Sequence, residues 1–86
     1  MFVIIFYDVE SKRCNKMLKK CRKYLQWVQN SVLEGEISAA SFEKMSTDIK
    51  SIIKANDSVV VYKFRHMKYY DRLVYGIEKK KEIKFI

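Results

Sequence analysis

An aspartate at the end of a hydrophobic segment has the clearest potential for chemistry in this sequence. Residues 1–7 are all apolar or aromatic, and Asp8 follows them directly. A carboxylate held at the end of a rigid strand suits a hard divalent cation such as Mg²⁺, which prefers oxygen ligands. Glu10 is the nearest second acid, but it shares a face with Asp8 only if the strand continues. Asp8 is therefore the candidate catalytic residue and metal ligand. The alternative is that it only complements the N-terminus of the next helix.

A strongly basic stretch follows this aspartate. Residues 12–23 contain seven Lys and Arg residues and no acid. Like charges at helical i,i+4 spacing repel each other, so such a run is better explained if it faces an anion. Nucleic acid phosphates are the expected anion, and an ordinary solvated helix face is the alternative. The candidate phosphate ligands in this run are Lys12, Lys16, Lys19 and Arg22.

The composition describes a small, basic, folded domain. The chain has 86 residues, a formal net charge of +8 and a sequence pI of about 9.6. A hydrophobic fraction of 49% and an aromatic fraction of 14% exclude a disordered basic tail. The excess positive charge favours RNA or DNA as a partner. Because so short a chain builds a small core, pairing with a second copy would add stability.

Neither a membrane nor an oxidising compartment is expected. No apolar run approaches the roughly 18 residues of a membrane span, and no basic segment precedes the N-terminal apolar run. Cys14 and Cys21 are seven residues apart. On a helix that spacing is about 10.5 Å, which is too far for a disulfide. We therefore expect reduced thiols, a cytoplasmic location and no membrane partner.

Hydrophobic periodicity divides the chain into helices and strands. Helices are predicted over residues 12–25 and up to about residue 55, with Ser11 and Ser38 as their N-caps. Residues 26–37 are predicted to form one long bent strand or two short strands, with Gly35 at the bend or bulge. The other predicted strands are residues 1–8, 57–65, 72–77 and 82–86.

The predicted fold class is α+β, a ferredoxin-like sandwich in which an antiparallel sheet carries both helices on one face. The expected order is strand, helix, strand, helix, strand, strand, in a domain of residues 1–78. Residues 79–86 would be a basic linker and an extra C-terminal strand. An unpaired terminal strand is an exposed edge, so we expect its exchange within a homodimer. A twofold axis near the end of the first strand would bring a second Asp8 to the same cation.

Three residues near the end of the domain have two possible roles each. His66 has no Cys, His or acid at ligand spacing, so it is either a loop residue or a functional base. Tyr69 and Tyr70 either stack on nucleic acid bases or anchor a loop. The sequence has no Gly-rich phosphate loop, G-x-S-x-G elbow or zinc pattern.

A set of short motifs occurs in order along nearly the whole chain. They are Tyr7-Asp8-Val9, Lys12-Arg13 with Asn15-Lys16, Trp27 to Val32 with Glu34-Gly35-Glu36, Val61-Tyr62-Lys63 and Gly76-Ile77-Glu78. Together they resemble the small CRISPR-associated endoribonuclease of the adaptation module. The resemblance is carried by the spacing of the set rather than by any single motif.

This resemblance implies a ferredoxin-like homodimer with Mg²⁺-dependent phosphodiesterase activity, Mn²⁺ being an alternative. It implies that Asp8 is the paired metal ligand at the dimer interface. It also implies a CRISPR integrase partner, with the small protein bridging two integrase dimers and binding the duplex that becomes a spacer. By motif position, Arg13 and Asn30 would contact nucleic acid near the metal. Leu33 departs from the family, which often has Phe before Glu-Gly, so no role is carried over to it.

Two functions of different class are therefore predicted. The first is a metal-dependent endonuclease of CRISPR adaptation that hydrolyses phosphodiester bonds of RNA or DNA, with Asp8 from each subunit holding the cation. The second is a non-catalytic adaptor that binds duplex DNA and bridges integrase subunits. A toxin-like ribonuclease that acts alone is a more distant third.

Overall fold

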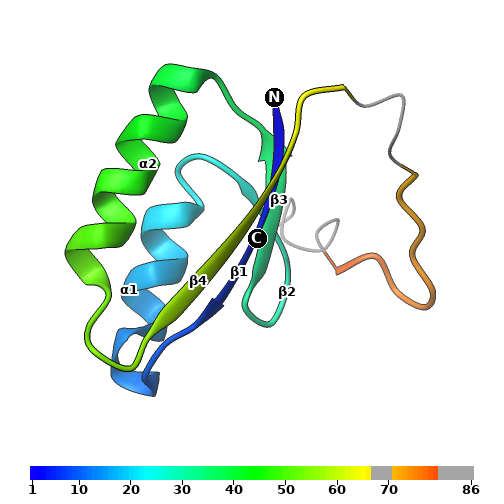
Figure 1. The fold of residues 1–86 in the computed structure, drawn as a ribbon. Coiled ribbons are helices and arrows are strands. Elements are labelled where there is room, and N and C mark those ends of the chain that lie inside the picture. The colour runs from blue at the N-terminus through cyan, green and yellow to red at the C-terminus, as the bar shows by residue number, and fades with distance from the viewer. Residues whose placement is uncertain (67–70, 80–86) are drawn as a thin grey trace.

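The computed structural model describes residues 1–66 and 71–79. In this part of the chain the elements are β1 (Phe2–Asp8), α1 (Ser11–Cys21), β2 (Gln26–Gln29), β3 (Val32–Glu36), α2 (Ala39–Ile52) and β4 (Ser58–Phe64). The strands form one antiparallel sheet in the order β2-β3-β1-β4. Both helices lie against the same face of that sheet (Figure 1). The predicted α+β ferredoxin-like fold class is confirmed.

β1 lies between β3 and β4 in the sheet, and the helices cover only one of its faces. Val3 and Ile5 are fully buried beneath the helices, and Tyr7 is nearly so. Phe6, on the opposite face, is 43% exposed. The uninterrupted apolar run therefore places apolar side chains on both faces of the sheet, and the helices cover one of these faces. We call the face of the sheet away from the helices the outer face.

α1 begins and ends at different residues from those predicted. Its N-cap is Glu10, whose side chain makes no capping bond, and Ser11 is the first helical residue. The helix ends at Cys21, whose carbonyl accepts hydrogen bonds from the backbone N–H groups of Tyr24 and Leu25. Leu25 is buried in the core. The chain leaves the helix early because Leu25 must reach the core before β2 begins.

The segment after α1 forms two short strands, which settles one of the open alternatives. Its turn is at Asn30, which has a positive φ of 41°, and not at Gly35. Gly35 lies within β3 opposite Val3. A Cβ atom at Gly35 would lie 3.4 Å from Leu25 Cδ2, so glycine allows the chain to pass close beside β3. The bulge in this hairpin falls between Trp27 and Gln29 in β2.

The core lies between the two helices and the inner face of the sheet. The serine cap predicted for α2 is confirmed, because Ser38 Oγ accepts a hydrogen bond at 3.1 Å from the backbone N–H of Ser41. The largest fully buried side chains are Ile5, Met17, Leu33, Met45, Val3 and Cys21. Both cysteines are free thiols, as predicted.

The strand predicted at residues 72–77 is wrong for the single chain. Residues 71–79 contain no strand, so the element order in the described residues is βαββαβ. Arg72 instead holds this segment to the sheet through an ion pair of 2.6 Å to Glu34 of β3, and a second ion pair of 2.6 Å joins Arg72 to Glu78 within the segment. Leu73, Tyr75 and Ile77 are 71 to 91% exposed. Tyr69, Tyr70 and the predicted strand 82–86 lie outside the described residues.

Candidate metal and nucleic-acid site

Asp8 is the last residue of β1 and is exposed. Side chains alternate along the strand, so Asp8 projects from the outer face together with Ile4 and Phe6. Within the described part of the chain, its side chain has no hydrogen bond or ion pair. Acids such as Asp57, Asp48 and Glu34 all have protein partners. Asp8 is therefore a fixed carboxylate with its oxygens available.

Two polar residues lie at the same end of the sheet as this carboxylate. Ser58, the first residue of β4, is directly opposite Asp8. Directly opposed residues of an antiparallel pair project from the same face, with Cβ atoms about 5 Å apart. Asn30 lies in the turn at the same end, because Ser31 O accepts a 3.0 Å hydrogen bond from Tyr7 N. The sequence prediction missed Ser58, whose place depends on the strand register.

Glu10 does not join Asp8 as a second metal ligand. The strand ends at Asp8, and Glu10 occupies the N-cap position of α1, where its side chain pairs with Arg13 at 2.9 Å. In residues 1–66 and 71–79 no three His, Cys, Asp or Glu side chains form a metal cluster. Mg²⁺ commonly takes only one or two protein carboxylates together with water and substrate phosphate. The hard oxygen donors of Asp8 fit that pattern, with one chain providing one carboxylate.

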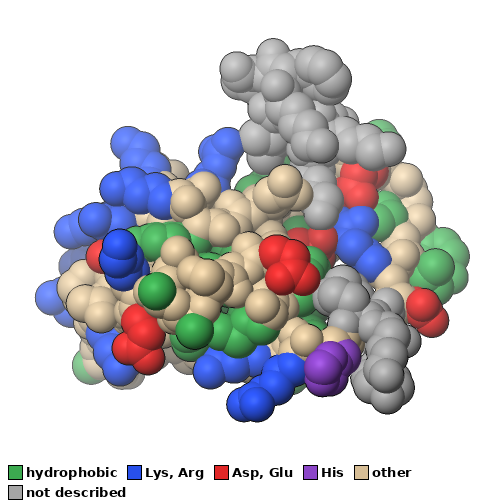
Figure 2. Space-filling model, turned by 90° about the horizontal axis from the view of Figure 1, so that it is seen from above, with side chains coloured by type: hydrophobic (Ala, Val, Ile, Leu, Met, Phe, Trp, Pro, Cys, Tyr) green, Lys and Arg blue, Asp and Glu red, His purple; other side chains and the backbone are tan. Residues whose placement is uncertain are grey.

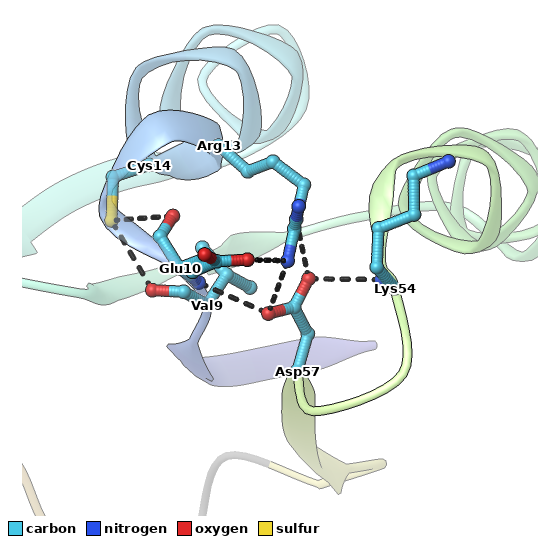
Figure 3. Close-up of polar contacts among 6 residues, drawn as sticks. All are labelled: Val9, Glu10, Arg13, Cys14, Lys54 and Asp57. Atoms are coloured by element: carbon cyan, nitrogen blue, oxygen red, sulfur yellow. Dashed lines mark hydrogen bonds and ion pairs between the residues drawn. The ribbon is translucent and has the colours of Figure 1, made fainter.

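Arg13 is enclosed by acids between the start of α1 and the loop before β4 (Figure 3). Its Nε donates to Asp57 Oδ2 at 2.6 Å, and Nη2 donates to Asp57 Oδ1 at 3.0 Å and to Glu10 Oε2 at 2.9 Å. The Arg13 side chain is 13% exposed and that of Asp57 is 2% exposed. The hydrogen bonds from Arg13 hold the pKa of Asp57 well below its usual range. Arg13 therefore makes its principal contacts within the protein.

Acid should weaken the fold through Asp57. In the unfolded chain an aspartate takes up a proton at a pH of about 3.9. Because its pKa is lower in the folded chain, Asp57 stabilises the fold above about pH 4 and loses this contribution as the pH falls further. The free energy of unfolding, measured by urea titration at several pH values, should therefore fall in acid. The fall should be smaller in Asp57→Asn, and an identical pH dependence would contradict this assignment.

The basic residues of α1 form a separate surface on the helical layer. Lys12, Lys16, Lys19 and Arg22 are all exposed, whereas Met17 and Cys21 face the core. Figure 2 shows Lys and Arg side chains gathered over the side of the molecule that the helices occupy. Lys12 lies in the first turn of the helix, four residues after Asp8 in the chain, and Arg22 follows about 15 Å along the axis. The structure brings Lys12 toward the aspartate end but does not bring Arg22 there.

The six residues predicted to contact nucleic acid are thus placed differently. Asn30 is exposed, like the four lysine and arginine residues above. Arg13 is the exception, because Asp57 and Glu10 surround its guanidinium group. His66 is exposed at the end of β4, with no metal-ligand cluster around it among the described residues. Leu33 is fully buried in the core, so its side chain cannot stack on a base.

The outer face beside Asp8 is apolar and open. Val60 and Tyr62 of β4 are 46% and 54% exposed. The Tyr62 ring meets the Phe6 ring edge to face, with 5.8 Å between centroids. A groove of about 430 Å³ lies between this face and residues 71–79, with Ile4, Phe6 and Val32 among its lining residues. Exposed apolar groups gathered on one face are typical of a protein interface.

Comparison with known proteins identifies the family. Residues 1–72 match the family described as CRISPR associated protein Cas2. The chain belongs to the Cas2 family. It is 52% identical over 82 residues to the CRISPR-associated endoribonuclease Cas2 of Dictyoglomus turgidum, covering 94% of each chain. It is 48% identical over 80 residues to the Pyrococcus furiosus protein of the same name, covering 92% of each.

Solved structures agree with this assignment. A crystal structure of Cas2 superposes with a TM-score of 0.82 at 43% identity, over 92% of this chain and 90% of that one. A Streptococcus pyogenes Cas2 structure at pH 6.5 gives a TM-score of 0.72 at 29% identity, over 86% and 99% of the two chains. In the described residues, neither helix of this Cas2 family member has the length and apolar character to cross a membrane.

Proposed function

We propose that this Cas2 family member is a metal-dependent endonuclease of CRISPR adaptation that hydrolyses phosphodiester bonds of RNA or DNA in the cytoplasm. The observation that carries this proposal is the position of Asp8. Its carboxylate has no partner in the described residues and shares the outer face with exposed apolar side chains. The endoribonuclease names of the relatives from D. turgidum and P. furiosus support the same class of reaction.

The active form in this proposal is a homodimer joined through the outer face. A second copy on this face would bury Phe6, Val60 and Tyr62, which the helices leave exposed. With a twofold axis near the end of β1, each copy would contribute one Asp8 carboxylate. The C-terminal strand at residues 82–86 would be exchanged between the copies, which adds to the same interface.

Mg²⁺, or Mn²⁺ in its place, would be held by the two Asp8 carboxylates together with phosphate oxygens of the substrate. When bound, the cation supplies positive charge that stabilises the phosphate as negative charge develops on it. The exposed side chains of Asn30 and Ser58 lie at this end of the sheet and can hydrogen-bond to the substrate. Lys12 lies at the adjacent helix start and can pair with a flanking phosphate.

A cleavage assay with the purified full chain tests this proposal. Labelled RNA and labelled duplex DNA are incubated with and without Mg²⁺ and Mn²⁺, and the products are separated by size. Cation-stimulated cleavage that co-purifies with the dimer is the expected result. If neither substrate is cleaved with either cation, the endonuclease proposal is wrong.

Removing charge from α1 should weaken nucleic-acid binding. Lys16, Lys19 and Arg22 are exposed on one helix, so the triple change to Gln should leave the core intact. If each contacts one phosphate, the slope of log binding constant against log salt should become shallower by about 2.7 for each chain of the dimer that contacts the duplex DNA. Fluorescence anisotropy at several salt concentrations measures it. A control with Lys44, Lys50 and Lys54 changed to Gln removes equal charge from the α2 side.

The adaptor function is the second candidate, because the basic surface of α1 lies largely away from Asp8. Such a surface could hold duplex DNA while the protein bridges two CRISPR integrase dimers, without cleavage. In that case Asp8→Asn should still support spacer integration with purified integrase, and the α1 triple variant should not. Loss of integration in Asp8→Asn alone would instead favour a catalytic role.

A further inference from the structure

Asp57 links two main-chain segments that lie beside Asp8, the segment that follows Asp8 and the strand opposite it. In sequence, Asp57 immediately precedes Ser58, the residue opposite Asp8 in the sheet. In space, Asp57 Oδ1 accepts a 3.0 Å hydrogen bond from the backbone N–H of Glu10, two residues after Asp8. Figure 3 shows this carboxylate between the start of α1 and the loop before β4. One side chain thus ties the segment that follows Asp8 to the strand beside it.

The contacts of this carboxylate are numerous and short. Asp57 Oδ2 accepts bonds from Arg13 Nε at 2.6 Å and from the backbone N–H of Lys54 at 2.9 Å. Arg13 Nη2 also donates to Oδ1, so Arg13 binds both oxygens of the carboxylate. Charge-assisted bonds in this forked arrangement are strong and directional. Because the Asp57 side chain is only 2% exposed, salt screens them little.

We propose that Asp57 and Arg13 form a positioning pair that sets the direction of the Asp8 carboxylate toward the divalent cation. This inference rests on the proposed cation site. A ligand group must be held within about 0.5 Å of its productive position. In a twofold site a displacement of Asp8 in one copy is repeated in the other, so both carboxylate ligands of the cation are displaced. Arg13 thereby acts through Asp57 and not by touching the substrate.

Binding of Mn²⁺ alone, followed by the loss of the electron paramagnetic resonance signal of free Mn²⁺, tests this proposal without catalysis. Wild type should bind Mn²⁺, and Asp8→Asn should abolish that binding. Asp57→Asn keeps the shape of the side chain but removes the charge that holds Arg13. It should weaken Mn²⁺ binding by about 10-fold, the lower end of what groups that orient metal ligands contribute. The half-saturating Mg²⁺ concentration for cleavage should rise by the same factor.

A matched control separates positioning from stability. Tyr24→Phe removes a 2.8 Å hydrogen bond from the segment just after α1 to Asp48 of α2, so it also loosens the packing of the two helices but acts within the helical layer. Each variant is assayed at the same interval below its own melting temperature. Tyr24→Phe should leave the Mn²⁺ dissociation constant unchanged. An equal weakening in Tyr24→Phe and Asp57→Asn would mean that stability alone is being measured, and would overturn the positioning role.

Arg13→Lys is the second variant, and it decides the matter if Asp57→Asn does not fold. It keeps the positive charge but loses the planar guanidinium group that binds both carboxylate oxygens. Weaker Mn²⁺ binding is therefore again expected. If Asp8→Asn still binds Mn²⁺ like wild type, the proposed cation site is absent. If binding requires Asp8 but both Asp57→Asn and Arg13→Lys bind normally, the cation site stands and the positioning pair is wrong. Cleavage without Asp8 would count against the proposed function alone.

Discussion

Asp8→Asn should lower cation-stimulated cleavage by at least about 100-fold while leaving the fold intact. Metal-assisted charge stabilisation is worth several kcal/mol, and each 1.36 kcal/mol corresponds to a factor of ten in rate. The substitution removes one negative charge from each copy and keeps the size of the side chain. Because Asp8 is exposed and bonds to no described side chain, little folding energy depends on its charge. Initial cleavage rates with saturating Mg²⁺ measure the effect.

Glu43→Gln is the matched control for that experiment. Glu43 is an exposed acid on α2, so its replacement makes the same charge change on the other layer of the protein. Cleavage and the melting temperature should both remain at the wild-type level. Duplex binding should be unchanged or slightly stronger in both variants, because each makes the chain more positive. If Asp8→Asn cleaved as fast as Glu43→Gln, the activity would not arise from the outer-face site.

The position of Asp8 could be predicted from the sequence, but its surroundings could not. An apolar run of seven residues ending in an acid fixes a strand and the carboxylate at its end. Which residue lies opposite Asp8 depends on the register between β1 and β4. That register depends on the lengths of α2 and its loops. Ser58 was therefore missed. The same run is apolar on both of its faces, although in one chain the helices cover only the face of Val3 and Ile5.

Charge patterning indicated a basic surface, but it did not distinguish the basic residues that are exposed from the one that forms an internal ion pair. Arg13 and Lys12 are adjacent in the sequence, yet Lys12 is exposed and Arg13 binds Asp57, 44 residues away. Long-range ion pairs leave no local signature, because only the fold brings α1 beside the loop before β4. The failed strand at residues 72–77 has a similar origin. Its β-branched and aromatic residues suit a strand, but Arg72 pairs with Glu34 and no strand of the same chain pairs with this segment in the described residues.

Tyr62→Glu should convert the proposed homodimer to a monomer and abolish cleavage, although it leaves Asp8 unchanged. Tyr62 is 54% exposed on the outer face, so a charge there is tolerated in the single chain. In the dimer the carboxylate would be buried without a partner, at a cost of about 3 kcal/mol for each copy. Twofold symmetry applies that cost twice, which weakens association by about 10⁴-fold. Light scattering gives the mass, and the cleavage assay gives the activity.

The distance between Tyr62 and Asp8 makes this result specific for the dimer. Tyr62 is opposite Ile4, four residues and therefore about 13 Å from Asp8 along β1. Ala55→Glu adds the same charge at an exposed site before β4 and should leave both mass and cleavage unchanged. A Tyr62→Glu protein that remained dimeric would place the interface elsewhere. A monomer that still cleaved would mean that one Asp8 suffices. A monomer without cleavage is the expected result, because the proposed activity needs the Asp8 carboxylates of two chains.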